Sequence, residues 1–149
     1  MELQTECHIY TSTKLFTEIQ NGTKNADFGF SRSLYHNQNG NTYDEKSDIK
    51  GTPSYIAPEI WEEGLYTEKS DVYSFGLIVY NILTQKLPFE KVQWFQIKEM
   101  VLNGERPEID ESINNVYTEL IQKCWQQDYN KRPTFEQIFT ELQNDHRYI

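Results

Sequence analysis

The chain has 149 residues, a formal net charge of −9 and an aromatic content of 14%. This length favours a single globular domain, and the many aromatic side chains argue against a disordered protein. The negative charge argues against binding to the phosphate backbone of a nucleic acid.

The first 26 residues show the weakest structural pattern of the chain. Residues 15–19 predict a short strand, and Asn21-Gly22 predicts a turn after it. The segment has neither the basic start nor the apolar run of a signal peptide. The two cysteines, Cys7 and Cys124, are too few for a disulfide framework and lack metal-ligand spacing. We therefore expect a cytoplasmic protein with reduced thiols.

The tripeptide Asp27-Phe28-Gly29 is followed by a polar stretch, residues 33–50, in which no apolar periodicity survives. This pattern predicts a mobile loop. Thr42, Tyr43 and Ser47 are candidate phosphorylation sites within it, although a solvated loop residue is the simpler interpretation of each. A phosphate on one of them could order the loop only by meeting a cluster of Arg or Lys.

Residues 70–84 are the stretch around which the rest of the chain is expected to fold. Apolar residues recur there at helical spacing and also fill the other sides, which predicts a helix buried on most of its surface. Ser70 is the expected N-cap, and Asp71 lies in the first turn, at the positive end of the helix dipole. The run is interrupted by Gly76 and Asn81 and is too short for a bilayer, which needs about 20 apolar residues.

Three further helices are predicted downstream. The first ends at Asn103-Gly104, and the last begins with a capping box, Thr134-x-x-Gln137. The bland interpretation is preferred for Cys124-Trp125, a core thiol beside a packed indole. The apolar positions of the three helices are, in chain order, Trp94, Ile97 and Val101, then Val116, Leu120, Ile121 and Cys124, and finally Phe135, Ile138, Phe139 and Leu142.

These motifs, in this order, resemble the C-terminal part of a protein kinase domain over roughly residues 27–143. Asp27-Phe28-Gly29 is similar to the DFG motif and Ala57-Pro58-Glu59 to the APE motif. Gly51-Thr52-Pro53 resembles serine/threonine kinases, whereas residues 70–76 and Cys124-Trp125 with Arg132-Pro133 resemble the tyrosine-kinase and tyrosine-kinase-like branches. The mixture indicates the tyrosine-kinase-like group, whose members mostly phosphorylate Ser or Thr.

The resemblance implies a mainly α fold, the C-terminal lobe of the kinase fold, with a short irregular or β segment at its start and no N-terminal lobe. Residues 1–26 would be a divergent remnant of the catalytic-loop region. Residues 27–145 would be the lobe itself, with an activation segment over 27–59 and a helical subdomain over 60–145.

The resemblance also assigns roles to single residues. The DFG aspartate of the family binds a Mg²⁺ ion that bridges the phosphates of ATP, so Asp27 is the implied metal ligand. Thr52 would help to position the substrate hydroxyl. Glu59 and Arg132 resemble the family's buried ion pair, and Asp71 resembles the aspartate that hydrogen-bonds the catalytic-loop backbone; these three are interpreted as structural.

The catalytic loop H-R-D-L-x-x-x-N of the family has no chemical counterpart here. In the matching register Ile9 occupies the catalytic-base position and Lys14 the asparagine position. Isoleucine cannot accept a hydroxyl proton, and lysine would repel the second Mg²⁺. The Gly-rich loop, the β3 lysine and its glutamate partner belong to the N-terminal lobe. We therefore expect the chain alone not to transfer phosphate and to bind ATP and Mg²⁺ weakly or not at all.

Two interpretations remain open. The first is a truncated record of a kinase, and the second is a non-catalytic, pseudokinase-like module that binds partners around Trp94 and the activation segment. Residues 7–14 separate them, since genuine coding sequence there favours the second and mistranslated sequence the first. A protein substrate or signalling partner is expected, and the missing lobe or another protein would cover the apolar surface left exposed on the central helix.

Overall fold

The computed structural model describes residue 49 and residues 51–148 of the chain. The described part is helical and contains no strand, which confirms the predicted mainly α fold; the strand predicted in residues 15–19 lies outside it. Its elements are η1 (Pro53–Tyr55), α2 (Pro58–Glu63), α3 (Glu68–Thr84), α4 (Trp94–Leu102), α5 (Asn115–Cys124), η2 (Tyr129–Lys131), α6 (Phe135–Asn144) and η3 (His146–Tyr148), where η marks a 3₁₀ turn.

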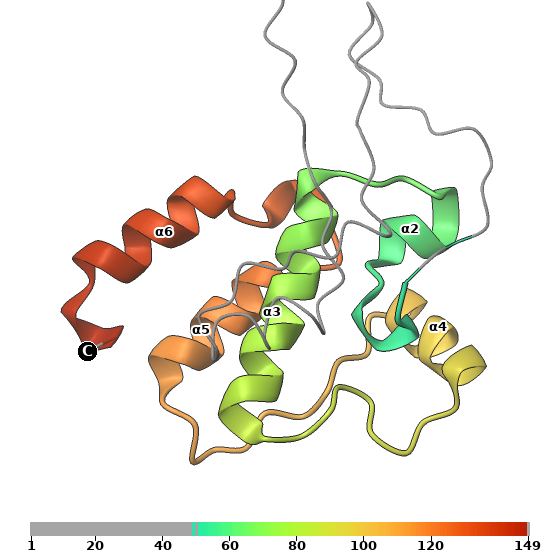
Figure 1. The fold of residues 1–149 in the computed structure, drawn as a ribbon, viewed down its shortest axis with the longest axis horizontal. Helices are drawn as coiled ribbons and strands as arrows, with labels where there is room; N and C mark the ends of the chain where they lie inside the picture. Colours follow the sequence, from blue (N-terminus) through green and yellow to red (C-terminus); the bar gives the residue numbers. More distant parts are fainter. Residues whose placement is uncertain (1–48, 50, 149) are drawn as a thin grey trace, which may run out of the picture.

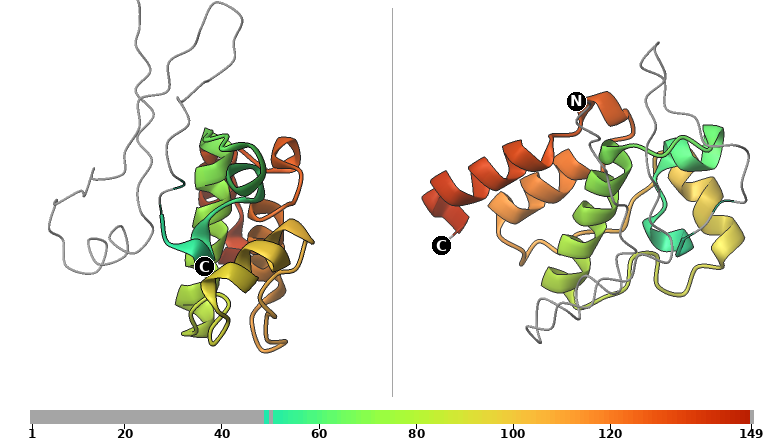
Figure 2. Two further views of the ribbon diagram at one scale, coloured as in Figure 1. Left: turned by 90° about the vertical axis from the view of Figure 1, so that its right-hand side faces the viewer. Right: turned by 45° about the horizontal axis from the view of Figure 1, so that its top comes forward.

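Helix α3 lies in the middle of the described part (Figure 1). Helices α5 and α6 lie on one side of it and α2 and α4 on the other, and the right-hand view of Figure 2 keeps this order. The most extensive contact between two elements joins α3 to α5, and the next joins α2 to α4. The prediction that the chain folds around residues 70–84 is confirmed by this arrangement.

Helix α3 begins at Glu68, before the predicted N-cap. Thr67 is the N-cap, because its hydroxyl oxygen accepts hydrogen bonds from the backbone N–H groups of Lys69 (3.2 Å) and Ser70 (3.3 Å). The Ser70 hydroxyl closes the capping box by accepting from the backbone N–H of Thr67 at 3.1 Å. The assignment of Ser70 as N-cap was therefore wrong, since both residues carry a hydroxyl and the backbone turns helical one step after Thr67.

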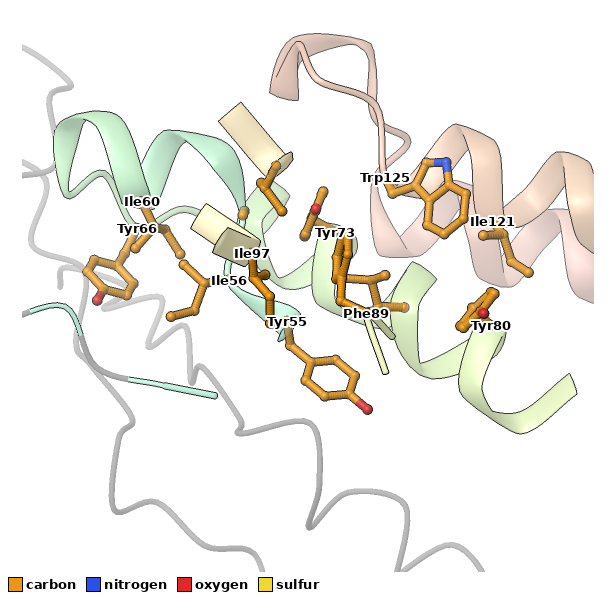
Figure 3. Packing of buried hydrophobic residues seen from close by; sticks show 13 residues of the cluster. Tyr55, Ile56, Ile60, Tyr66, Tyr73, Tyr80, Phe89, Ile97, Ile121 and Trp125 are labelled. Atoms are coloured by element: carbon orange, nitrogen blue, oxygen red, sulfur yellow. The ribbon is translucent and has the colours of Figure 1, made fainter. Parts of the chain in front are cut away.

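A hydrophobic cluster surrounds α3 (Figure 3). Burying one large apolar side chain contributes roughly 1.5–3 kcal/mol, so this cluster is the main source of the lobe's stability. The cluster takes Tyr73, Leu77 and Tyr80 from α3, Ile121 and Trp125 from the α5 region, Ile60 from α2, Ile97 and Val101 from α4, and Tyr55, Ile56, Ala57, Tyr66 and Phe89 from the connections.

A smaller cluster of Val72, Leu120, Cys124 and Ile138 joins α3, α5 and α6. The predicted core positions of Cys124 and Trp125 are confirmed, since both side chains are buried. Gly76 makes the close crossing of α3 and α5 possible, because a Cβ atom at this position would lie 2.7 Å from the Cβ of Cys124. Real carbon atoms do not approach so closely without displacement of one helix.

Helices α4 and α5 were predicted correctly, and α6 begins at the predicted capping box, in which the Thr134 hydroxyl accepts from the Gln137 N–H. Two faces are less covered than their apolar pattern suggests. Trp94, at the start of α4, is 64% exposed. On the predicted apolar face of α6 only Ile138 is buried, while Phe135, Phe139 and Leu142 are 44%, 59% and 36% exposed.

The central helix shows a similar incompletely covered side. Ile82 is exposed, and Phe75, Ile78, Val79 and Leu83 are only half-buried. Phe75 contacts Phe135 of α6 edge to face, with 5.7 Å between ring centroids. None of the helices in the described part combines the length and hydropathy that crossing a membrane requires.

The crossing of α3 and α5 can be tested by replacing Gly76 with alanine. In an ordinary helix this change stabilises by about 0.5–1 kcal/mol. Here we expect Gly76→Ala to lower the free energy of unfolding by about 1–3 kcal/mol, because the new methyl group forces the helices apart. Urea denaturation followed by circular dichroism measures the change. A stabilised variant would contradict the close crossing.

Candidate functional site

The candidate site divides between residues that the structure describes and residues that it does not. Thr52, Glu59, Asp71 and Arg132 lie in the described part. The remaining candidates lie outside the described residues, and these are Ile9, Lys14, Asp27, Thr42, Tyr43 and Ser47.

Glu59 and Arg132 form a buried, two-pronged ion pair. The two terminal nitrogens of Arg132, Nη1 and Nη2, donate to Oε1 and Oε2 of Glu59, each at 2.8 Å. The side chains are 0% exposed for Arg132 and 4% for Glu59. The Ser70 hydroxyl donates a third hydrogen bond to Oε1 of Glu59, also at 2.8 Å. Such a fork-to-fork geometry is the strongest form of this interaction.

The other donors of Arg132 are also used. Its Nη1 donates to the backbone carbonyl of Lys69 at 2.8 Å, and its Nε donates to the carbonyl of Gln126 at 2.8 Å. A longer contact of 3.5 Å joins Nη2 to the carbonyl of Gln127. A guanidinium group has five N–H donors, so each of them has a partner here. The cost of burying the two charges is offset only because of this complete set of hydrogen bonds.

Local sequence places both partners of the pair. Pro58 occupies the first position of α2 and Ala57 its N-cap, so Glu59 lies in the first turn, where a carboxylate is favoured by the helix dipole. Arg132 follows the short turn η2, whose N-cap Asp128 accepts from the backbone N–H of Asn130 at 3.0 Å. The Lys69 ammonium, in addition, donates to the carbonyl of Arg132.

Tyr73 lies between this ion pair and the hydrophobic cluster. The guanidinium carbons of Arg132 and Arg106 lie 5.0 and 5.1 Å from the centre of its ring, within the range of cation–π attraction. Its buried hydroxyl has no hydrogen-bond partner among the described residues. Burial raises the pKa of Tyr73 to about 12, so the ring stays neutral beside the two cations.

Sequence reasoning missed Tyr73, Arg106 and the true role of Ser70. Ser70 could have been found from the capping pattern, because Thr67 also precedes the apolar run by a suitable interval. Arg106 donates from Nε to the carbonyl of Trp125 at 3.0 Å and from Nη2 to Oε1 of Gln127 at 2.7 Å. No periodicity in the sequence marks such a contact.

Thr52 and Asp71 lie apart from the ion pair's hydrogen bonds. Thr52 is exposed and precedes η1, and its hydroxyl makes no capping hydrogen bond. Asp71 is half-buried in the first turn of α3, and no hydrogen bond to its carboxylate is found within the described part. Burial, with a smaller contribution from the charge of Glu68, raises the pKa of Asp71 to about 7.

The arrangement of the described residues ties α2 to the segment before α6 and offers no reaction chemistry of its own. Within residues 51–148, no group of three or more His, Cys, Asp or Glu side chains could hold a metal ion. The described site is therefore an anchor rather than a reaction centre.

Comparison with known proteins gives one family. Residues 11–142 match the family described as protein tyrosine and serine/threonine kinase. The match begins before Asp27, so it extends further toward the N-terminus than the motifs that suggested the resemblance.

Curated relatives come from Dictyostelium discoideum. A probable serine/threonine-protein kinase is 36% identical over 134 residues, which is 90% of this chain and 14% of the relative. An RGS domain-containing serine/threonine-protein kinase A is 36% identical over 81% of this chain and 10% of its own length. The probable serine/threonine-protein kinase roco8 is 36% identical over 80% of this chain and 6% of its own length. The chain thus spans only a small part of the relatives it matches.

Removing the buried arginine tests the anchor. We expect Arg132→Ala to lower the free energy of unfolding by about 3–5 kcal/mol, because the Glu59 carboxylate is left buried without its counter-charge. The matched control is Lys123→Ala, which breaks an exposed ion pair of similar length, 2.9 Å to Glu141. This control should cost less than about 1 kcal/mol. Equal losses in chemical denaturation would contradict the assigned role of burial.

The carboxyl of Asp71 gives a pH-dependent prediction. Because the folded pKa of Asp71 is about 7, above its ordinary value, the folded state binds the extra proton between about pH 4 and 7, and stability falls as pH rises through this range. We expect Asp71→Asn to raise the free energy of unfolding near pH 8 by roughly 1–3 kcal/mol, since partial exposure screens the full effect. The gain should disappear near pH 4. A gain independent of pH in denaturant titrations would contradict the assignment.

Proposed function

The chain belongs to the protein tyrosine and serine/threonine kinase family, and we propose that it is the C-terminal lobe of a kinase of the tyrosine-kinase-like group. In this proposal, residues 1–26 are a divergent remnant of the catalytic-loop region, residues 27–59 the activation segment and residues 60–145 the helical subdomain. The observation that carries it is the buried pair of Glu59 and Arg132, which joins the end of the Ala57-Pro58-Glu59 motif to Arg132-Pro133.

The reaction of the parent enzyme is phosphoryl transfer from ATP to serine or threonine of a protein in cytoplasmic signalling. Curated relatives named as serine/threonine-protein kinases support this specificity, although the chain covers between 6% and 14% of those compared above. The exposed Thr52, whose hydroxyl is not used in capping, supports a role in positioning the hydroxyl of the substrate. Thr42, Tyr43 and Ser47 remain candidates for phosphorylation of the activation segment.

Asp71 supports the same assignment. A half-buried carboxyl in the first helical turn, with no hydrogen bond from the described residues and a raised pKa, lacks the partner that its position calls for. In the proposed kinase domain this partner is the backbone of the catalytic loop. An N–H group donating to Asp71 would favour its charged form and lower its pKa again.

The nucleotide chemistry of the proposal depends on residues outside the described part. Asp27 is the proposed ligand of Mg²⁺, which a carboxylate oxygen suits. In kinases the ion, when bound with ATP, neutralises charge that develops on the transferred phosphoryl group. Ile9 and Lys14 occupy the positions of the catalytic base and the second metal ligand, so neither function is supplied within these 149 residues. We propose that this chain, taken alone, does not transfer phosphate.

A non-catalytic, pseudokinase-like interaction module is the second candidate. The observation that favours it is the family match, which begins at residue 11 and so includes Lys14. This supports a kinase origin for at least residues 11–26 and weakens the explanation that they are mistranslated sequence. The mass of the endogenous protein, measured with an antibody against residues 117–149, separates the candidates. A band near 17.7 kDa favours the module, and a much larger band favours the tail of a complete kinase.

The proposal predicts no enzymatic activity for the purified 149-residue chain. Incubated with radiolabelled ATP, Mg²⁺ and a generic protein substrate, the chain should incorporate no more label than the Asp27→Ala variant. The reason is that phosphoryl transfer depends on positioning and charge stabilisation by groups that are absent here. Steady turnover that Asp27→Ala abolishes would overturn the proposed inactivity.

A further inference from the structure

A groove of about 660 Å³ lies beside the C-terminal end of α3. The loop from α3 to α4 and the loop from α4 to α5 form its walls, and both run past this end of α3 (Figure 1). We call it the two-loop groove, and its lining consists of Tyr80, residues 86, 87, 89, 90 and 92, Met100 and residues 106–111. We propose that the two-loop groove binds a basic peptide segment that carries one aliphatic anchor side chain.

The apolar part of the groove is continuous with the hydrophobic core. Tyr80 and Phe89 are core residues, and Val92, Met100 and Ile109 pack against the same cluster but stay half-buried. Their remaining exposed surface faces a concave space instead of a flat surface. A volume of this size is typical of ligand sites and exceeds what one side chain fills. One aliphatic side chain of a partner would therefore be buried on several sides.

One wall of the groove is held in shape by its own hydrogen bonds. The backbone N–H of Glu90 donates to the carbonyl of Leu87 at 3.1 Å, and that of Val92 donates to Phe89 at 3.0 Å. The Asn81 amide donates to the carbonyl of Lys86 at 2.7 Å. Phe89 also has a left-handed backbone, with φ of 56°. A wall that is already ordered loses little entropy when a ligand binds.

The rim of the groove is negative. Its exposed carboxylates belong to Glu90, Glu108, Asp110 and Glu111. Asp110 is held by the backbone N–H of Ser112, which donates to its Oδ1 at 2.9 Å.

Only two cations line the groove. Arg106 is engaged elsewhere, since its guanidinium lies over the ring of Tyr73 and donates to the carbonyl of Trp125 and to Gln127. Lys86 is left as the one lining cation without such contacts, against four carboxylates. The complementary occupant is therefore positively charged, and phosphate-bearing ligands and anionic membranes are disfavoured.

A peptide with Lys or Arg on both sides of one Leu, Ile or Val satisfies the floor and the rim together. The aliphatic side chain enters the space beside Met100 and Ile109, and the flanking cations meet Glu90, Glu108 and Glu111. Binding of this kind needs neither ATP nor Mg²⁺, so it goes beyond the proposed kinase function. Its failure would leave the assignment of the lobe untouched.

The test uses a fluorescein-labelled peptide of sequence Gly-Arg-Arg-Leu-Arg-Arg-Gly and the complete 149-residue chain, followed by fluorescence anisotropy. We expect saturable binding with a dissociation constant below about 1 mM. Reversing two rim charges with Glu108→Lys and Glu111→Lys should weaken binding at least about tenfold. The matched control, Glu62→Lys with Glu63→Lys on α2, makes the same change in net charge at exposed residues outside the groove and should weaken it less than about twofold.

Two further measurements test the anchor and guard against misfolding. A peptide with Ser in place of Leu should bind about tenfold more weakly, because the apolar contact is lost. Lys86→Glu should tighten binding, which does not depend on the rim variants remaining folded. The proposal is overturned if binding does not saturate, if both double variants weaken it equally, if the Ser peptide binds as well, or if Lys86→Glu has no effect.

Discussion

The buried pair of Glu59 and Arg132 is the constraint on which the described structure depends. It joins residues 73 positions apart in the sequence, and both charges are withdrawn from water. A buried charge without its counter-charge costs several kcal/mol, so neither partner can move alone. The pair therefore fixes the position of α2, and with it the end of the proposed activation segment, relative to the segment that precedes α6.

The surroundings of the pair explain how it is tolerated. Ser70 uses its hydroxyl twice, accepting from Thr67 in the capping box and donating to Glu59. The start of α3 and the ion pair therefore form together. Tyr73 then lies between the pair and the core, with two guanidinium groups over its ring. The central helix is in this way connected at one end to charge and along its length to apolar packing.

The sequence predicted the helices well because their periodicity and caps are local properties. Helices α4, α5 and α6 follow from apolar spacing and, for α6, from Thr134-x-x-Gln137. The choice between Thr67 and Ser70 as N-cap depends on where the backbone turns helical, which the residue types do not decide. The proximity of Glu59 and Arg132 was inferred only through a family resemblance, because no local rule connects residues so far apart. The contacts of Arg106 and Tyr73 arise from tertiary packing and have no signal in the sequence.

Periodicity also cannot say whether an apolar face is covered. The spacing on α6 is as regular as that on α5, yet Phe135 and Phe139 remain exposed while Leu120 and Ile121 are buried. The difference lies in the neighbours: α5 packs against the whole length of α3, whereas α6 meets it mainly through Ile138 and the Phe75–Phe135 contact. The ion pair and the main cluster do not include this face or the rim of the two-loop groove. Changes at these outer surfaces can therefore alter what the lobe binds while the central anchor, and the fold that it maintains, stay the same.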